Sequence, residues 1–473
     1  MSSAQKLIND LKKRVGKQII SEDIYERASH GQDTSGSDLD VEKIPMAVVK
    51  PSSAQQVSQV VKFANQHNIP IYIHGAGTAF KGSPRPKLPG SLVLSMLEFN
   101  SFEMFEGDMY FEAGAGLNQY ELEKKLKKLG YFLPMNIGSK YSATIGGAVA
   151  INTIGHMVDI CLGRIIDYVM GLEVVLPNGE IIETGTRSIR RPGGIDYTRF
   201  FVGSEGLFGI VTKVRIRLLP DFHKAHVVGF FPKLSDIGRA FIRYYKEKLS
   251  PPLYGELLDK SACLSPFRLR GLGEPKGHMA LAINIAHSQE EVDRQAEETV
   301  RVFKAEKAIE AFVVTSAKEQ SDYWDSRDNI LNILQANEEE DRMVRVGSLE
   351  AAMPLSHLAE AIDYLKSGHP YSTLHEAKPF IYGHVGTCDL HGMWAAPSDW
   401  PVEKRRQAVK ETYLLESEIN LKWGCVSGEI GQTADRIPFL KKRYGEAAFS
   451  VLTGIKKAMD PNNILNPGNL NED

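Results

Sequence analysis

The chain has 473 residues, of which 42% are hydrophobic and 24% charged, and its formal net charge at pH 7 is -3. This length predicts two or three folded units, because a single hydrophobic core stops growing well below this size. The near-neutral charge, with both signs mixed along the chain, argues against nucleic acid as a partner.

The sequence predicts a cytoplasmic protein without a transmembrane segment, or one that is peripheral to a membrane through a partner. Residues 1–14 carry charged and amide side chains throughout, and no later stretch approaches the ~20 apolar residues that span a bilayer. Neither disulfides nor an iron-sulfur cluster held by this chain alone is expected, because the cysteines are isolated. They are Cys161, Cys263, Cys388 and Cys425.

The first elements predict a β-α-β unit. Residues 47–49 and 70–74 have the composition of short strands. The segment between them repeats apolar side chains at the spacing of one helix face, at Val57, Val60, Val61 and Ala64. Asn118 and Glu121 have the spacing of a capping box and predict the start of another helix.

Later patterns indicate a second α+β domain. Asn178-Gly179 predicts a hairpin over 172–183, and 209–219 alternates as a strand. The glycine-rich loops stop there, and a strand over 280–286 and a helix beginning at Ser288 follow. We therefore predict three parts, namely 1–220, 221–415 and a C-terminal segment 416–473 that returns to the first part.

Loops of consecutive small residues recur in the first half of the chain. Such loops let backbone N–H groups approach an anion without obstruction by side chains. They lie at 75–79, 138–148 and 203–209. Phe80 stands where a Rossmann fingerprint has its last glycine, so the spacing of the first loop alone does not identify a dinucleotide site. The three loops together favour a large diphosphate cofactor.

The order and spacing of these motifs resemble the FAD-binding domain of the p-cresol methylhydroxylase/vanillyl-alcohol oxidase superfamily. The resemblance is carried by 138–152, 171–179, 201–206 and 209–212, and 460–468 is similar to the C-terminal signature of the family. It implies an α+β fold with a two-subdomain FAD-binding domain of p-cresol methylhydroxylase type and an α+β substrate domain, or cap.

The resemblance also implies which residues bind FAD. The diphosphate would lie on the loop at 75–79 and the loops around 138–152, while Asn466 would return to the flavin. Members that attach FAD covalently near the first loop have a histidine at the place of Thr78, so noncovalent FAD is expected. The implied cofactor-binding residues are Gly75, Ala76, Gly77, Thr78, Ala79, Gly138, Ser139, Thr144, Gly146, Gly147, Asn152, Gly209, Ile210 and Asn466.

Within the superfamily, the chain resembles the FAD-linked D-2-hydroxy-acid dehydrogenases. Trp324-Asp325-Ser326-Arg327 is similar to their aromatic-x-x-Arg element, and 383–391 is similar to their paired-histidine hairpin. A guanidinium suits a substrate carboxylate because it donates two parallel hydrogen bonds. Without the resemblance, Arg327 would be interpreted as a solvated charge on a polar helix. The implied ligands of a divalent Zn, Mn or Fe ion are His384, His391 and Glu429.

Two departures from the family concern the chemistry. The family usually has Asp-Gly-Asn between the two histidines, where this chain has Thr387-Cys388-Asp389. Metal-dependent members have a histidine after the ligand glutamate that is proposed to take the hydroxyl proton, but here that residue is Ile430. Candidates for the base are then His375, His384 and Tyr382. The predicted catalytic residues are Arg327, His384 and His375.

The implied reaction oxidises a D-2-hydroxy acid such as D-lactate or glycolate to the 2-oxo acid. An electron-transferring flavoprotein, an iron-sulfur subunit or a quinone would take the electrons. One alternative is a transferase that resembles alkyldihydroxyacetone-phosphate synthase, although its adjacent histidines are absent near Glu429. Another is an electron-transfer flavoprotein subunit of a redox complex with a decayed substrate site, for which Ile430 and the altered hairpin would be signs.

Overall fold

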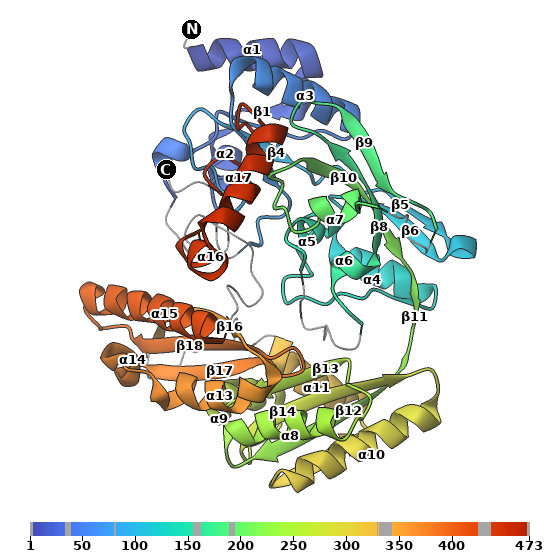
Figure 1. The fold of residues 1–473 in the computed structure, drawn as a ribbon, viewed down its shortest axis with the longest axis vertical. Helices are drawn as coiled ribbons and strands as arrows, with labels where there is room; N and C mark the ends of the chain where they lie inside the picture. The colour runs from blue at the N-terminus through green and yellow to red at the C-terminus, as the bar shows by residue number, and fades with distance from the viewer. Residues whose placement is uncertain are drawn as a thin grey trace. The chain divides into compact units, whose positions relative to one another are not determined.

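The computed structural model describes residues 3–33, 39–79, 82–153, 155, 162–188, 194–328, 330, 343–423 and 437–470. The chain forms two compact units (Figure 1). The first unit contains Met1–Gly155, Arg164–Asp221 and Ile430–Asp473, and the second contains His156–Gly163 and Phe222–Glu429. The three-part division at residues 220 and 415 stays a prediction.

The first unit has a four-stranded sheet, a five-stranded sheet and a small two-stranded sheet. In sheet order, the strands are β1 Ile20–Ser21, β2 Ala47–Val49, β4 Leu92–Ser95 and β3 Ile71–His74, then β5 Phe102–Phe105, β6 Tyr110–Gly114, β10 Ile210–Arg217, β8 Val169–Val175 and β9 Ile181–Gly185, then β11 Leu219–Pro220 and β7 Tyr131–Phe132. Its helices are α1 Ser3–Val15, α2 Ile24–Ser29, α3 Ala54–His67, α4 Gln119–Lys128, α5 Ile145–Ala150, α6 Ile165–Tyr168, α7 Tyr197–Phe201, α16 Ile437–Tyr444 and α17 Glu446–Met459.

Local signals in the sequence explain these elements. The Ser53 hydroxyl accepts a hydrogen bond from the backbone N–H of Gln56 at 3.3 Å and so caps α3. The strands before and after α3 are the predicted ones, with β4 between them and parallel to both. The Asn118 side chain caps α4, and Gly179 has a φ of 81° in the turn between β8 and β9. The β-α-β unit, the capped helix and the hairpin are confirmed.

The second unit is built on one seven-stranded sheet. Its strands, in sheet order, are β15 Glu310–Val314, β12 His223–Phe231, β14 His278–Ala286, β13 Tyr254–Leu258, β17 Lys378–His384, β18 Asp389–Pro397 and β16 Met343–Ala352. Its helices include α8 Leu234–Lys246, α9 Lys260–Arg270, α10 Gln289–Ala305, α11 Ala317–Asp328, α13 Leu358–Asp363, α14 Ser372–Glu376 and α15 Val402–Trp423.

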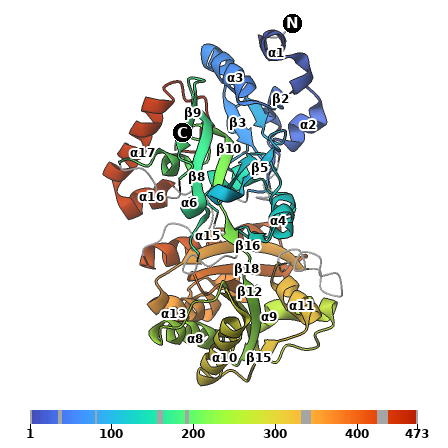
Figure 2. The same ribbon diagram turned by 90° about the vertical axis from the view of Figure 1, so that its right-hand side faces the viewer.

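A separate hydrophobic core covers each face of this sheet. One core joins the sheet to α8, α10, α13 and α15, and the other joins it to α9 and the aromatic residues of α11. Figure 2 shows α9 and α11 together, apart from α8, α10 and α13. The mixed helix and sheet arrangement confirms the predicted α+β class. Among the described residues we find no helix with the length and apolar character that a membrane crossing requires.

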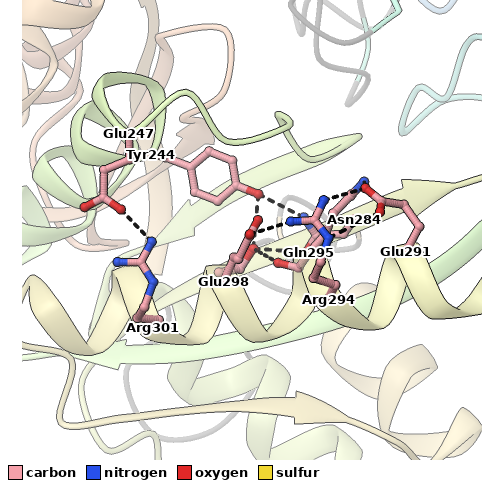
Figure 3. A network of polar contacts seen from close by, with 9 residues as sticks. Tyr244, Glu247, Asn284, Glu291, Arg294, Gln295, Glu298 and Arg301 are labelled. Carbon is pink, nitrogen blue, oxygen red and sulfur yellow. Dashed lines mark hydrogen bonds and ion pairs between the residues drawn. The ribbon is translucent and has the colours of Figure 1, made fainter.

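A buried polar network attaches α8 and α10 to the sheet (Figure 3). The Asn284 amide donates to the Tyr244 hydroxyl at 3.1 Å, and the Thr299 hydroxyl donates to the Asn284 carbonyl oxygen at 3.1 Å. At the helix surface, Arg301 pairs with Glu247 at 2.5 Å. Asn284 bonds both hydroxyls, which also lie 3.2 Å from each other, and buried polar groups cost stability when one partner is lost.

We expect Asn284→Leu to lower the free energy of unfolding of the second unit by about 1–3 kcal/mol, because two buried hydroxyls each lose a partner. All four tryptophans lie in this unit, so their fluorescence during urea unfolding reports on it. Glu297→Gln, at an exposed position of α10, should change the urea midpoint little. An unchanged midpoint in Asn284→Leu would show that the network contributes nothing.

Candidate functional site

The predicted cofactor loops of the first unit lie together at the end of β3. Gly75 packs against the Thr144 side chain so closely that a Cβ on Gly75 would lie 2.7 Å from Oγ1. The loop at 203–206 is joined to the end of α5, because Gly203 donates to the Val149 carbonyl at 3.0 Å and Glu205 donates to the Ala150 carbonyl at 2.8 Å. Loops that are far apart in the sequence therefore form one surface.

Asn466 ties these loops together from the C-terminal segment. Its side-chain oxygen accepts from the Ile73 N–H at 3.0 Å, and its amide group donates to the Glu205 carbonyl at 2.6 Å. Its backbone N–H donates to the Ile71 carbonyl at 2.8 Å, alongside a bridge between Ile71 and Leu465. Asn466 was predicted to return to the flavin. The structure shows its side chain bonded to the backbone of strand β3 and of the loop at 203–206, and a contact with the flavin stays a prediction.

The other predicted FAD residues have different surroundings. Gly138 and Ser139 form a turn in which the Ser139 carbonyl accepts from Ala143 at 2.8 Å. Ile210 is 0% exposed, so the described residues cover both its side chain and its backbone, and its contact with FAD stays a prediction. A Cβ on Gly209 would lie 2.6 Å from the Val174 side chain, so close packing already requires this glycine.

One predicted FAD residue has a buried polar atom without a partner. Asn152 has a left-handed φ of 50°, and its buried Oδ1 has no hydrogen-bond partner among the described residues. The loop at 75–79 is half-buried and consists of small residues. An unpaired amide oxygen and a half-buried loop of small residues in the same unit suit a polar cofactor such as FAD.

In the second unit, α11 packs on β13 through the aromatic-x-x-Arg element. The Trp324 ring lies 4.7 Å from the Tyr254 ring, and the Nε of Arg327 lies 2.6 Å from the Glu256 carboxylate. Both contacts can form at once because Trp324 and Arg327, three apart on the helix, lie on one face of α11. Tyr254 and Glu256, two apart on the strand, likewise lie on one face of β13. Arg327 is only 3% exposed, so it is not the solvated charge that its polar helix suggested.

The predicted histidine hairpin is confirmed. His384 ends β17 and His391 lies in β18, and their ring centroids are 5.2 Å apart with perpendicular planes. The Tyr382 ring stacks on His391 at 5.2 Å. Cys388 occupies the family's glycine position in the turn with a φ of 59°, a left-handed conformation that favours glycine.

Glu256 is the functional candidate that sequence reasoning missed. It lies in the central strand β13, is 0% exposed and bridges two predicted site residues. Its Oε2 accepts from Arg327, and its Oε1 lies 2.7 Å from the Nδ1 of His384, its cross-strand neighbour. The one signal in the sequence was a single acid within an apolar strand. We call Glu256, Arg327, Tyr382, His384 and His391 the Glu256 cluster.

The described residues do not complete a metal site. Among them, no three histidine, cysteine or carboxylate side chains are close enough together to hold a metal ion. His384 and His391 supply two imidazoles, while Glu429 and Ile430 lie outside the described residues. A metal ion on His384, His391 and Glu429 therefore stays a prediction.

His375 is not part of the Glu256 cluster. It lies on α14, is exposed, and its Nε2 is 2.8 Å from the His369 carbonyl. Strand β17 begins after it, at Lys378, and His384 stands at the other end, about 20 Å away at ~3.3 Å per residue. The structure therefore brings Arg327, His384 and Tyr382 together but leaves His375 apart.

The structure predicts that the first cofactor loop loses stability in acid. Burial, and then the neighbouring His30 ring at 4.7 Å, lowers the pKa of His74 from 6.5 to about 4. The unfolded chain therefore binds a proton first, and stability is lost as the pH falls from 6.5 to 4, by at most about 1.4 kcal/mol per pH unit. Hydrogen exchange of the segment 71–79, corrected for intrinsic rates, should report this loss.

His74→Gln should remove the acid dependence, whereas His67→Gln, at an exposed position of the same unit, should keep it. An equal acid response in wild type and His74→Gln would contradict the assignment to His74.

Comparisons with known proteins agree with this architecture. Residues 45–185 match the family model of the FAD binding domain, and residues 222–470 match that of the C-terminal domain of FAD linked oxidases. D-lactate dehydrogenase of Archaeoglobus fulgidus is 29% identical over 426 residues, which cover 89% of this chain and 90% of that protein. Glycolate oxidase subunit GlcD of Bacillus subtilis is 28% identical over 91% of this chain and 89% of that protein.

Solved structures share the fold. p-Cresol methylhydroxylase with substrate bound has a TM-score of 0.78 at 18% identity and covers 98% of this chain and 96% of its own. Alkyldihydroxyacetonephosphate synthase has a TM-score of 0.73 at 19% identity, over 98% of this chain and 84% of its own. The second family model alone spans more than half of the chain. The chain therefore belongs to the FAD-linked oxidases, and it is an FAD-linked oxidoreductase with the fold of p-cresol methylhydroxylase.

Proposed function

We propose that the protein oxidises a D-2-hydroxy acid of the D-lactate or glycolate class to the 2-oxo acid. The observation that carries the proposal is the buried Glu256 cluster, which pairs a guanidinium with an imidazole on one face of the sheet. The names of the relatives, D-lactate dehydrogenase and glycolate oxidase, support the same class of substrate.

Arg327 would hold the substrate carboxylate. Glu256 occupies its Nε, so the edge that donates two parallel hydrogen bonds is formed by the two Nη groups on the other side. The guanidinium carbon also lies 5.1 Å from the Tyr382 ring centroid, which adds a cation–π attraction.

His384 would take the proton of the substrate hydroxyl. Its Nδ1 faces a carboxylate, which favours the tautomer with hydrogen on Nδ1 and a lone pair on Nε2. FAD, when bound, would supply the acceptor for the hydrogen of C2 and its electron pair. Loss of one proton to Nε2 and one hydride to FAD balances the conversion of a hydroxy acid to an oxo acid.

Three features remain proposals. The electrons would pass to an electron-transferring flavoprotein, an iron-sulfur subunit or a quinone, and the protein would be cytoplasmic or peripheral to a membrane through such a partner. FAD would be noncovalent, because Thr78 stands at the place of the linkage histidine. The transferase alternative has only the shared fold in its favour.

We expect D-lactate or glycolate, but not L-lactate, to reduce the bound flavin. Arg327→Lys should raise KM by about 30-fold or more without changing FAD content, because a buried bidentate pair contributes about 2–5 kcal/mol. Arg268→Lys, at an exposed position of α9, serves as the control. Flavin that no hydroxy acid reduces would favour the transferase or the electron-transfer alternative, and wild-type kcat/KM in Arg327→Lys would refute the clamp.

We expect acid precipitation of the yellow protein to release its FAD into the supernatant. Flavin retained in the pellet would contradict noncovalent attachment.

A metal ion on His384, His391 and Glu429 would occupy the Nε2 lone pair of His384 and so exclude this atom as the base. Elemental analysis of protein purified without a histidine tag, together with flavin reduction in chelator, decides between the two roles. One Zn, Mn or Fe per chain with loss of flavin reduction in chelator would make His384 a metal ligand instead of the base. Full activity in chelator with far less than one metal ion per chain would rule the metal out.

A further inference from the structure

We infer that Glu256 is a positioning residue that selects the reactive tautomer of His384 and fixes Arg327 at the same time. The inference rests on the proposed function. It starts from the two oxygens of one fully buried carboxylate, each of which contacts a different site residue, at 2.6 Å for Arg327 Nε and 2.7 Å for His384 Nδ1. The separation of the guanidinium and the imidazole is therefore set by a single rigid group.

The backbone leaves Glu256 little freedom to move. Strand β13 lies between β14 and β17, and Glu256 is paired directly with His384 in the sheet. The next two residues, Leu257 and Leu258, belong to the two opposite hydrophobic cores. A side chain held in this way can act as a fixed reference for both partners.

A merely structural role explains the arrangement less well. The Trp324 and Tyr254 rings already pack α11 onto β13. Apolar side chains at 256 and 327 could complete this contact without burying charges, and such replacements are often neutral or stabilising. A charge bridge that also includes an imidazole is instead suited to orienting chemical groups, as carboxylates do for the histidines of catalytic and metal sites.

Glu256→Gln provides a sharp test, because a glutamine can accept from only one of the two partners. Arg327 always donates, so the glutamine oxygen must face Arg327 and its NH₂ group must face His384. His384 Nδ1 would then accept, and its hydrogen would move to Nε2, which could no longer take the hydroxyl proton. Arg327 would remain held.

The experiment combines nitrogen NMR with kinetics. In protein with ¹⁵N-labelled histidine, the His384 signals are identified by their loss in His384→Gln, and hydrogen is expected on Nδ1 in wild type and on Nε2 in Glu256→Gln. The first-order rate of flavin reduction should fall by about 100-fold or more, the scale of general-base catalysis. Oxalate serves as a carboxylate probe, and its binding is followed by the change in flavin absorbance. The Kd of Glu256→Gln for oxalate should lie within about fivefold of the wild-type Kd, because Arg327 keeps its partner.

Glu411→Gln is the matched control, because Glu411 is also a buried carboxylate but accepts from Thr373 and Leu374 on another part of the second unit. It should leave the His384 tautomer and the reduction rate unchanged. Hydrogen on Nε2 in the wild type would overturn the inference even if Glu256→Gln failed to fold, as would an unchanged tautomer in a folded Glu256→Gln. If no hydroxy acid reduces the wild-type flavin, the proposed function fails while the tautomer still decides the role of Glu256.

Discussion

A carboxylate buried without solvent must have its charge compensated, and this constraint organises the second unit around Glu256. An isolated ionised group costs far more in the interior than a folded protein can spare, so Arg327 and His384 have to meet it. Arg327 meets it from α11, which packs on β13 through the Trp324 and Tyr254 rings. His384 meets it from β17, whose pairing with β13 makes His384 the cross-strand neighbour of Glu256. One buried charge is thus shared by two elements that packing and sheet pairing bring together.

In the first unit, neutral backbone groups need hydrogen-bond partners in the same way as the buried charge does in the second. The backbone at the end of β3 and the carbonyl in the loop at 203–206 need hydrogen-bond partners, and the two halves of the Asn466 amide supply them. Close packing adds a second constraint, because a Cβ on Gly206 would lie 2.6 Å from Ile73 and 2.8 Å from the Asn466 amide nitrogen. The small residues of these loops thus serve the packing of the loops as well as access to the backbone.

The sequence predicted well what neighbouring residues determine. The cap at Asn118, the turn at Gly179 and the histidine hairpin depend on residues within a few positions, and all were found where expected. Glu256 could not be found in this way, because its partners are 71 and 128 residues away and no spacing links them. His375 was a candidate for the base because Ile430 replaces the family's histidine, but the extended length of β17 separates it from His384.

The altered turn between His384 and His391 is weak support for a decayed substrate site. Replacing a glycine at a positive φ by Cys388 costs on the order of 1–2 kcal/mol, yet the turn keeps this conformation. The positions of the two histidines are set instead by sheet pairing on both sides, since β17 pairs with β13 and β18 pairs with β16. Because the flanking ladders rather than the turn hold His384 and His391, a change in the turn leaves their rings beside Tyr382 and Glu256. The pairing that positions the two histidines thus does not depend on which residues form the turn between them.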